Sequence, residues 1–254
     1  MRLEHSDYKN LTWGPLTAVL GTVVIFFGGQ IIAGIVLYLI LLAYGWDTDR
    51  ITAWFGGGGS AQFALSISIS LVTLGLLYFF LKRRKAKLAD IGLVRPRLKD
   101  AGYALAGLGV YITFYIFIVS VLARLFTSLN LEQQQELGFD KASTGSALVM
   151  VFIALVVLPP LVEEIISRGF LFSGLRRGFK FLPAALITSL IFGIAHLPGG
   201  EGGSTIWIAF IDTFVLSMVL VYLRERTGSL WPSIGLHGLK NLVAFLVLFV
   251  FKIS

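Results

Sequence analysis

Long stretches without a charged residue constrain this chain more than any other feature. Five segments contain no Asp, Glu, Lys or Arg and two more contain one each; the seven are 16–44, 60–81, 101–123, 142–162, 181–200, 202–223 and 227–251. A helix of about 20 apolar residues, rising about 1.5 Å per residue, crosses a hydrocarbon core about 30 Å thick. The runs lack the alternation of apolar and polar residues that membrane barrel strands show. The sequence therefore predicts an all-α fold, a polytopic membrane helical bundle of about seven, or eight, transmembrane helices.

The composition excludes several other classes of protein. Hydrophobic residues make up 56% and charged residues 14%, against about 25% charged residues in a typical soluble domain. Such a chain is too apolar for intrinsic disorder. The absence of cysteine excludes a disulfide-stapled secreted module and removes thiol nucleophiles and thiolate metal ligands. We expect one integral-membrane domain over residues 1–254, with membrane lipid and no nucleic acid among its partners.

The distribution of Lys and Arg predicts the orientation of the bundle. With seven spans, the N-terminus and the second, fourth and sixth connections lie on one side and carry 15 basic residues, whereas the opposite side carries four. Basic residues are enriched in cytoplasmic connections. We therefore expect a multi-pass protein of a prokaryotic plasma membrane, with a cytoplasmic N-terminus.

Ionisable residues inside apolar segments are costly and indicate function. The first such cluster follows the fourth segment, where Glu164 and Arg168 are four residues apart and share a helix face, so that they can neutralise each other. Glu163 points about 100° away and has no cation close by in the sequence, which makes it the candidate general base. Pro159 and Pro160 remove two backbone donors, and we expect a kink that frees carbonyl groups beside the acids. The alternative is an ordinary charged helix end at the membrane surface.

Two further clusters contain two of the three histidines of the chain. Phe192 and His196 are four residues apart, as are His237 and Asn241, so each pair shares a helix face. An amide such as Asn241 can orient a histidine or stabilise an oxyanion. The alternative for both clusters is hydrogen bonding that packs one helix against another.

Taken together, one acid and two imidazoles from three helices suit the activation of water for hydrolysis. Asp212, in the middle of the sixth segment, belongs to none of these clusters. It supports a rival interpretation, a proton-coupled transporter or channel that uses Glu163, Asp212 and the histidines as a relay. The alternative for Asp212 is pairing with Lys240 or with a hydroxyl group on a neighbouring helix.

The three clusters resemble the signature of the CAAX-protease and bacteriocin-processing (CPBP, or Abi) family of intramembrane proteases. The signature, Glu-Glu-x-x-x-Arg, Phe-x-x-x-His and His-x-x-x-Asn, is present in this order at Glu163-Glu164…Arg168, Phe192…His196 and His237…Asn241. Residues 88–93 and 228–234 are also typical of the family. The resemblance places a motif-bearing catalytic core at residues 160–245.

The resemblance implies a CAAX prenyl protease-like membrane endopeptidase that hydrolyses a peptide bond of a membrane-anchored or membrane-embedded substrate. In that family role, Glu163 activates water with His196, and His237 and Asn241 hold the oxyanion. Glu164, Arg168 and Phe192 are then supporting residues. A non-catalytic scaffold of the bacteriocin-immunity type is a further alternative.

The cofactor is left open by the sequence. Glu163, His196 and His237 match the ligand set of a zinc hydrolase, but a metal-free glutamate base explains the same residues, and it is slightly preferred.

The predicted span boundaries leave one conflict. A fifth span that starts at residue 181 on the cytoplasmic side places His196 about 22 Å deep, whereas Glu163 lies near the inner face at the end of the fourth span. We expect a displaced boundary, together with helix tilt, to bring the two together.

Overall fold

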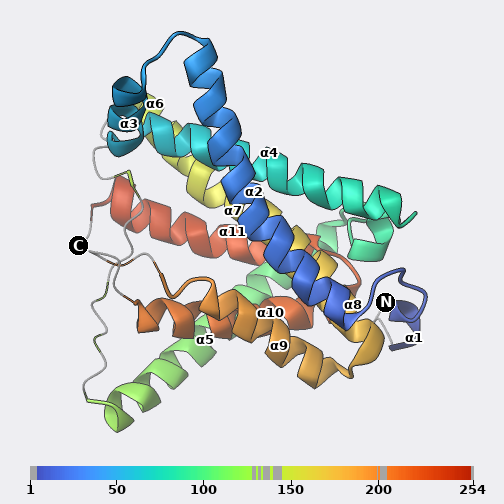
Figure 1. The fold of residues 1–254 in the computed structure, drawn as a ribbon. Coiled ribbons are helices and arrows are strands. Elements are labelled where there is room, and N and C mark those ends of the chain that lie inside the picture. Colours follow the sequence, from blue (N-terminus) through green and yellow to red (C-terminus); the bar gives the residue numbers. More distant parts are fainter. Residues whose placement is uncertain are drawn as a thin grey trace.

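The protein is a bundle of apolar helices, as predicted (Figure 1). The structure, a computed structural model, describes residues 5–127, 130, 133, 138–139, 145–198, 200 and 205–252. Within these residues, six helices are long and apolar enough to cross a membrane: α2 (Pro15–Ala43), α4 (Ser60–Arg83), α5 (Leu98–Leu125), the broken helix Gly145–Gly178, α10 (Trp207–Thr227) and the helix Trp231–Val250. A seventh apolar helix, α9 (Phe181–Ile194), is shorter. The short elements α1 (His5–Tyr8), α3 (Thr48–Gly56) and the 3-10 helix η1 (Leu88–Ile91) lie in the connections.

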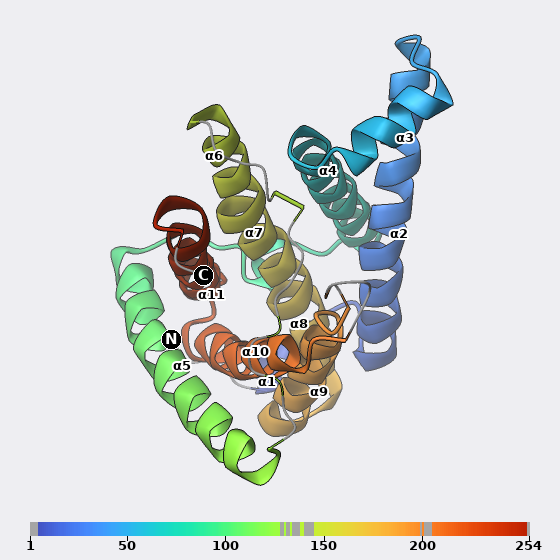
Figure 2. The same cartoon turned by 90° about the vertical axis from the view of Figure 1, so that its left-hand side faces the viewer.

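The broken helix lies at the centre of the bundle. It comprises α6 (Gly145–Phe152), η2 (Ile153–Val157), α7 (Leu158–Glu164), η3 (Ile165–Leu171) and α8 (Phe172–Gly178), of which η2 and η3 are π-helical. The last span likewise comprises α11 (Trp231–Phe245) and the π-helical η5 (Leu246–Val250). Helices α2 and α4 pair on one side of the broken helix, and α5, α10 and α11 pack together on the other (Figure 2).

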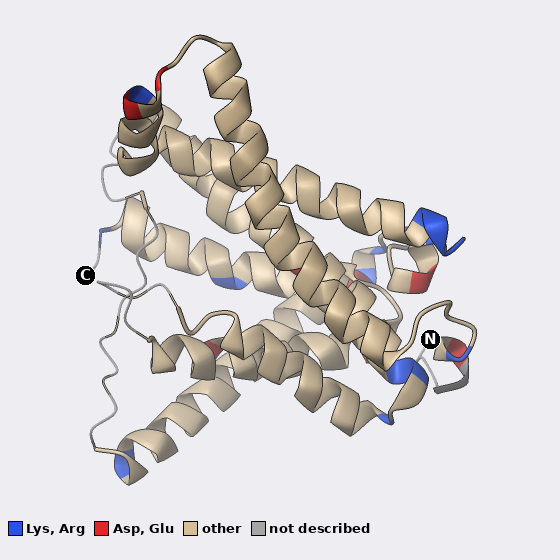
Figure 3. Ribbon diagram, in the orientation of Figure 1, with Lys and Arg blue, Asp and Glu red and all other residues tan. Residues whose placement is uncertain are grey.

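Charge is concentrated at the two ends of the bundle. Basic residues gather where α4 and α8 end, on the right of Figure 3, and the flanks between the ends are almost free of charge. On these flanks large apolar side chains such as Ile31, Leu71 and Phe117 are exposed. An apolar surface of this extent is typical of a protein that faces lipid.

The broken helix extends well beyond the predicted end of the fourth span at residue 162. It continues to Gly178, so Glu163 lies 15 residues before its end, a rise of about 22 Å. His196 lies 15 residues after Phe181, the first residue of α9, which is the same rise. The predicted boundary was therefore displaced, and the two side chains reach the same depth. The boundary was wrong because the charges that follow residue 162 are paired inside the protein and do not mark a membrane surface.

Buried polar contacts hold the N-terminal segment against the basic end of the broken helix. Arg176 of α8 forms an ion pair with Glu225 of α10 at 2.7 Å, and the Tyr8 hydroxyl donates to the same carboxylate at 2.9 Å. Burial raises the pKa of the Tyr8 phenol, so the hydroxyl keeps its proton and remains a donor. The indole of Trp13 donates to the carbonyl of Phe170 in η3 at 3.1 Å. These contacts fix the end of the helix that carries the acids.

Two adjacent glycines in α2 have different environments. A Cβ added to Gly29 would lie 2.3 Å from Thr73 Oγ1 and 3.4 Å from the Thr73 Cα atom, whereas a Cβ added to Gly28 would have no neighbour within 4 Å. Gly29 therefore permits the close approach of α2 and α4, a common use of small residues between membrane helices.

We predict opposite effects for alanine at these two positions. Gly29→Ala should lower the free energy of unfolding by about 1–3 kcal/mol, because the overpacked site must push α4 away. Gly28→Ala, the matched control, should be neutral or slightly stabilising, since alanine favours a helix over glycine. Thermal unfolding in detergent measures both; equal melting temperatures for the two variants would show that α2 and α4 do not depend on this contact.

Candidate active site

The side chains of Glu163 and His196 face each other across a short gap. Glu163 is on α7, and His196 follows the end of α9. Glu163 Oε2 lies 3.9 Å from His196 Nε2, and about a quarter of each side chain is exposed. Among the described residues, Oε2 has no hydrogen-bond partner. The distance is too long for a direct hydrogen bond and is within the reach of one bridging water molecule.

The other nitrogen of His196 determines which tautomer faces Glu163. Nδ1 lies 2.8 Å from the backbone carbonyl of Phe192, and a carbonyl oxygen can only accept, so Nδ1 carries the proton. In the neutral ring, Nε2 is then an acceptor. The carbonyl of Phe192 is available because the helix ends here and the His196 amide donates to Gly193 instead.

A second carboxylate, Glu164, joins two of the three clusters. Its Oε1 lies 2.9 Å from Arg168 Nη1 and 3.0 Å from His237 Nδ1. The side chains of Glu164 and Arg168 are completely buried, and that of His237 is 6% exposed. The predicted pairing of Glu164 with Arg168 is confirmed. The contact with His237 was missed, because nothing in the sequence indicates which face of α11 packs against α7.

Phe192 lies between the charged groups of the site. The Arg168 guanidinium carbon is 4.3 Å from the centre of the ring, a cation–π contact. The rings of His196 and His237 lie 4.7 and 6.1 Å from the same ring, centre to centre. Phe192 therefore contacts the buried arginine and both histidines, and its supporting role stays a prediction.

The prolines free backbone carbonyls, as expected, and α11 packs on this stretch of backbone. Pro159 has no N–H to donate to Leu155 O, four residues earlier. The Asn241 amide nitrogen donates to this carbonyl at 2.9 Å. A Cβ on Gly238 would lie 3.6 Å from Val156 O, the acceptor that Pro160 leaves free. Asn241 thus ties α11 to the broken helix, and its share in holding an oxyanion stays a prediction.

The three candidate metal ligands do not form a metal-binding group among the described residues. Within the described part of the chain, no group of three or more His, Cys, Asp or Glu side chains could hold a metal ion. Glu163 faces His196, whereas His237 turns Nδ1 toward Glu164. The predicted ligand set of Glu163, His196 and His237 is therefore not assembled in this arrangement.

Asp212 lies outside this site and has local partners. Its Oδ2 is 2.8 Å from Lys240 Nζ, and its Oδ1 accepts a hydrogen bond from the Tyr111 hydroxyl. The alternative interpretation of Asp212, an ion pair with Lys240, is confirmed. The position of Asp212 in the middle of an apolar segment, which supported a proton relay, is thereby explained by its contacts with neighbouring helices.

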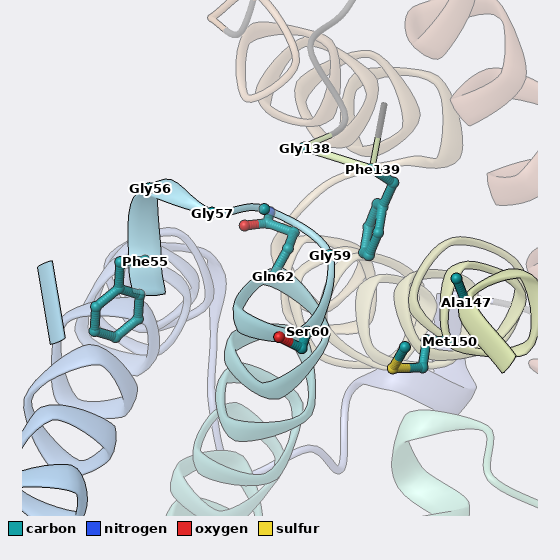
Figure 4. A pocket seen from close by; sticks show the side chains of 11 residues that line it. Phe55, Gly56, Gly57, Gly59, Ser60, Gln62, Gly138, Phe139, Ala147 and Met150 are labelled. Atoms are coloured by element: carbon teal, nitrogen blue, oxygen red, sulfur yellow. The ribbon is translucent and has the colours of Figure 1, made fainter. Parts of the chain in front are cut away.

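A cavity of about 400 Å³ lies at the far end of the broken helix, between the start of α4 and α6 (Figure 4). Its lining includes the glycines of residues 56–59, Phe139 and Met150. Its described lining contains no residue of the three clusters and no acidic, basic or histidine side chain. The candidate site is therefore separate from it.

Comparison with known proteins supports the resemblance found in the sequence. Residues 145–243, which contain all three clusters, match the model of the family described as Type II CAAX prenyl endopeptidase Rce1-like. The uncharacterized protein YyaK of Bacillus subtilis (strain 168) is 31% identical over 113 residues, which is 42% of this chain and 36% of the relative. The chain thus spans little more than a third of the length of this curated relative. No solved structure matches the chain.

We predict that removing the Glu164 carboxylate destabilises the fold. Glu164→Ala leaves the buried Arg168 guanidinium without its counter-ion, which should cost about 3–5 kcal/mol of unfolding free energy. Glu163→Ala is the matched control, since this neighbouring carboxylate is part-exposed and should change the melting temperature little. A Glu164→Ala protein as stable as the control would show that the pair with Arg168 has no structural role.

Proposed function

We propose that this protein is an intramembrane endopeptidase, CAAX prenyl protease-like, that hydrolyses a peptide bond of a membrane-anchored or membrane-embedded substrate. One observation carries the proposal: two acceptors, Glu163 Oε2 and His196 Nε2, face each other 3.9 Å apart. A water molecule between two acceptors at this distance is able to donate one hydrogen bond to each of them. The family match over residues 145–243 points to the same chemistry.

The first step is attack by this water. It donates one hydrogen bond to Glu163 and one to His196 Nε2, and Glu163 takes a proton as the O–C bond forms at the substrate carbonyl. The carbonyl π electrons move to its oxygen, which becomes the oxyanion of a tetrahedral intermediate. When the C–N bond breaks, the proton held by Glu163 passes to the leaving amine.

In this proposal, His237 and Asn241 stabilise the oxyanion. His237 Nδ1 donates to Glu164, which fixes the orientation of the ring, and Nε2 donates to the oxyanion in the form of the ring that carries a hydrogen on both nitrogens. The Asn241 amide has two hydrogens, and one of them is bound to Leu155 O. The proposed role of Glu164 and Arg168 is to hold His237 in place.

The location of the site supports a membrane substrate. Glu163 and His196 lie about 22 Å along their helices from the end where basic residues gather (Figure 3). We propose that this end faces the cytoplasm, in agreement with the positive-inside rule, and that the scissile bond reaches the site from the lipid phase.

We predict that Glu163→Gln abolishes cleavage and preserves the fold. Glutamine keeps the shape of the side chain but cannot take a proton, so the rate should fall at least about 100-fold. Mass spectrometry of peptides released from membranes that contain either protein measures this loss. Asp49→Asn, a neutralised carboxylate on the exposed helix α3, is the matched control and should cleave like the wild type.

Three outcomes would contradict the proposal. Cleavage by Glu163→Gln at the wild-type rate would exclude Glu163 as the base. Identical peptides from membranes with and without the protein would favour a non-catalytic scaffold. Flux driven by a pH gradient in liposomes, with no hydrolysis, would favour the transporter.

A further inference from the structure

A second charged cluster lies in the membrane interior beside the candidate site. Lys240 of α11 is 2.8 Å from Asp212 of α10, and Tyr111 of α5 donates its hydroxyl hydrogen to the same carboxylate. Three spans are therefore joined at one side chain. Asp212 is 15 residues before Thr227, the last residue of α10, so it lies at a rise of about 22 Å, the same as that of Glu163 and His196.

A cluster of charged and polar side chains packs three helices together at a higher free-energy cost than apolar side chains would. Charged groups at this depth are costly in a bilayer, and apolar residues of similar volume are often as stable as a buried ion pair or more stable. The side chains are 26% and 18% exposed, so the pair is not sealed from its surroundings either. A buried polar contact can fix one register between helices, which is the best attested use of such contacts.

The register of α11 matters because His237 lies on it. At about 100° per residue, Lys240 and Asn241 project to opposite sides of His237. Asn241 binds Leu155 O on the broken helix, and Lys240 binds Asp212 on the other side. The two contacts flank the histidine about one helical turn beyond it, so together they oppose rotation of the helix in either direction. A rotation or slide of α11 would break both contacts and withdraw His237 from Glu164.

We propose that Tyr111, Asp212 and Lys240 are positioning residues for His237: they form a polar clamp that sets the rotation and depth of α11. The clamp touches none of the reacting atoms of the proposed mechanism. Its effect on turnover rests on the proposed function, whereas its effect on the position of α11 does not.

The first test removes the clamp without leaving an unpaired polar group. The triple variant Tyr111→Phe, Asp212→Leu, Lys240→Met should keep or raise the melting temperature, but its kcat should fall at least about tenfold with KM within about twofold. Swapping the charges, as Asp212→Lys with Lys240→Asp and Tyr111→Phe, restores the link and should recover most of the lost kcat. Ser233→Ala is the matched control, because Ser233 makes another contact between α11 and α10, to Leu220 O at 2.9 Å.

The second test measures the position of α11 without any activity. The chain has no cysteine, so spin labels can be placed at Val157→Cys on η2 and Val243→Cys on α11, both exposed positions. Electron–electron double resonance should give one narrow distance in the otherwise wild-type protein and in the charge swap. The triple variant should give a shifted or broadened distribution.

The outcomes separate the clamp from the proposed function. A triple variant with the wild-type distance, or with wild-type kcat at an equal melting temperature, would overturn the clamp. Failure of the charge swap to recover both kcat and the narrow distance would overturn it as well. If the wild-type protein cleaves nothing, the proposed function fails, and the distance measurement still decides whether the clamp holds α11.

Discussion

The Glu164 carboxylate is the contact on which the rest of the site depends. It is fully buried and binds Arg168 on its own helix and His237 on α11. Glu164 and Arg168 neutralise each other within the broken helix, and the hydrogen bond from His237 Nδ1 to the same carboxylate joins α11 to this pair. Phe192 is then held under the Arg168 guanidinium, and with it α9 and His196. One ion pair therefore brings the three clusters together.

The prolines show how a local defect becomes a tertiary contact. Without an N–H at position 159, the carbonyl of Leu155 has no partner within its own helix, and lipid offers none. The chain bridges this stretch with the π-helical η2, where the Leu158 amide donates to Ile153 O, five residues back. Asn241 then supplies the missing donor from α11. The carbonyl that Pro159 leaves without a donor in the broken helix thus becomes the acceptor that binds α11.

Glu163 and Glu164 have different environments because they project from different sides of the same helix. Glu164 points into the bundle and is fully buried, and its Oε1 binds both Arg168 and His237, whereas its Oε2 has no hydrogen-bond partner among the described residues. Glu163, one residue earlier, keeps an unpartnered oxygen among the described residues and faces His196. A base must exchange its proton with water, and of the two side chains only that of Glu163 is part-exposed (22%, against 0% for Glu164). The two glutamates therefore differ in their surroundings because successive residues of a helix project about 100° apart.

From the sequence alone, the helical membrane fold, the three clusters and the pairing of Glu164 with Arg168 could be predicted, because each depends on composition or on spacing within one helix. The end of the fourth span could not be predicted from the sequence. The charged residues after residue 162 look like the start of a connection outside the membrane until their partners inside the protein are known. The pairing of Asp212 with Lys240 could be predicted only as an alternative. The contacts of His237 with Glu164 and of Asn241 with Leu155 join residues at least 73 positions apart. Only tertiary structure decides these, because helical periodicity tells which residues share a face and not which helix that face meets.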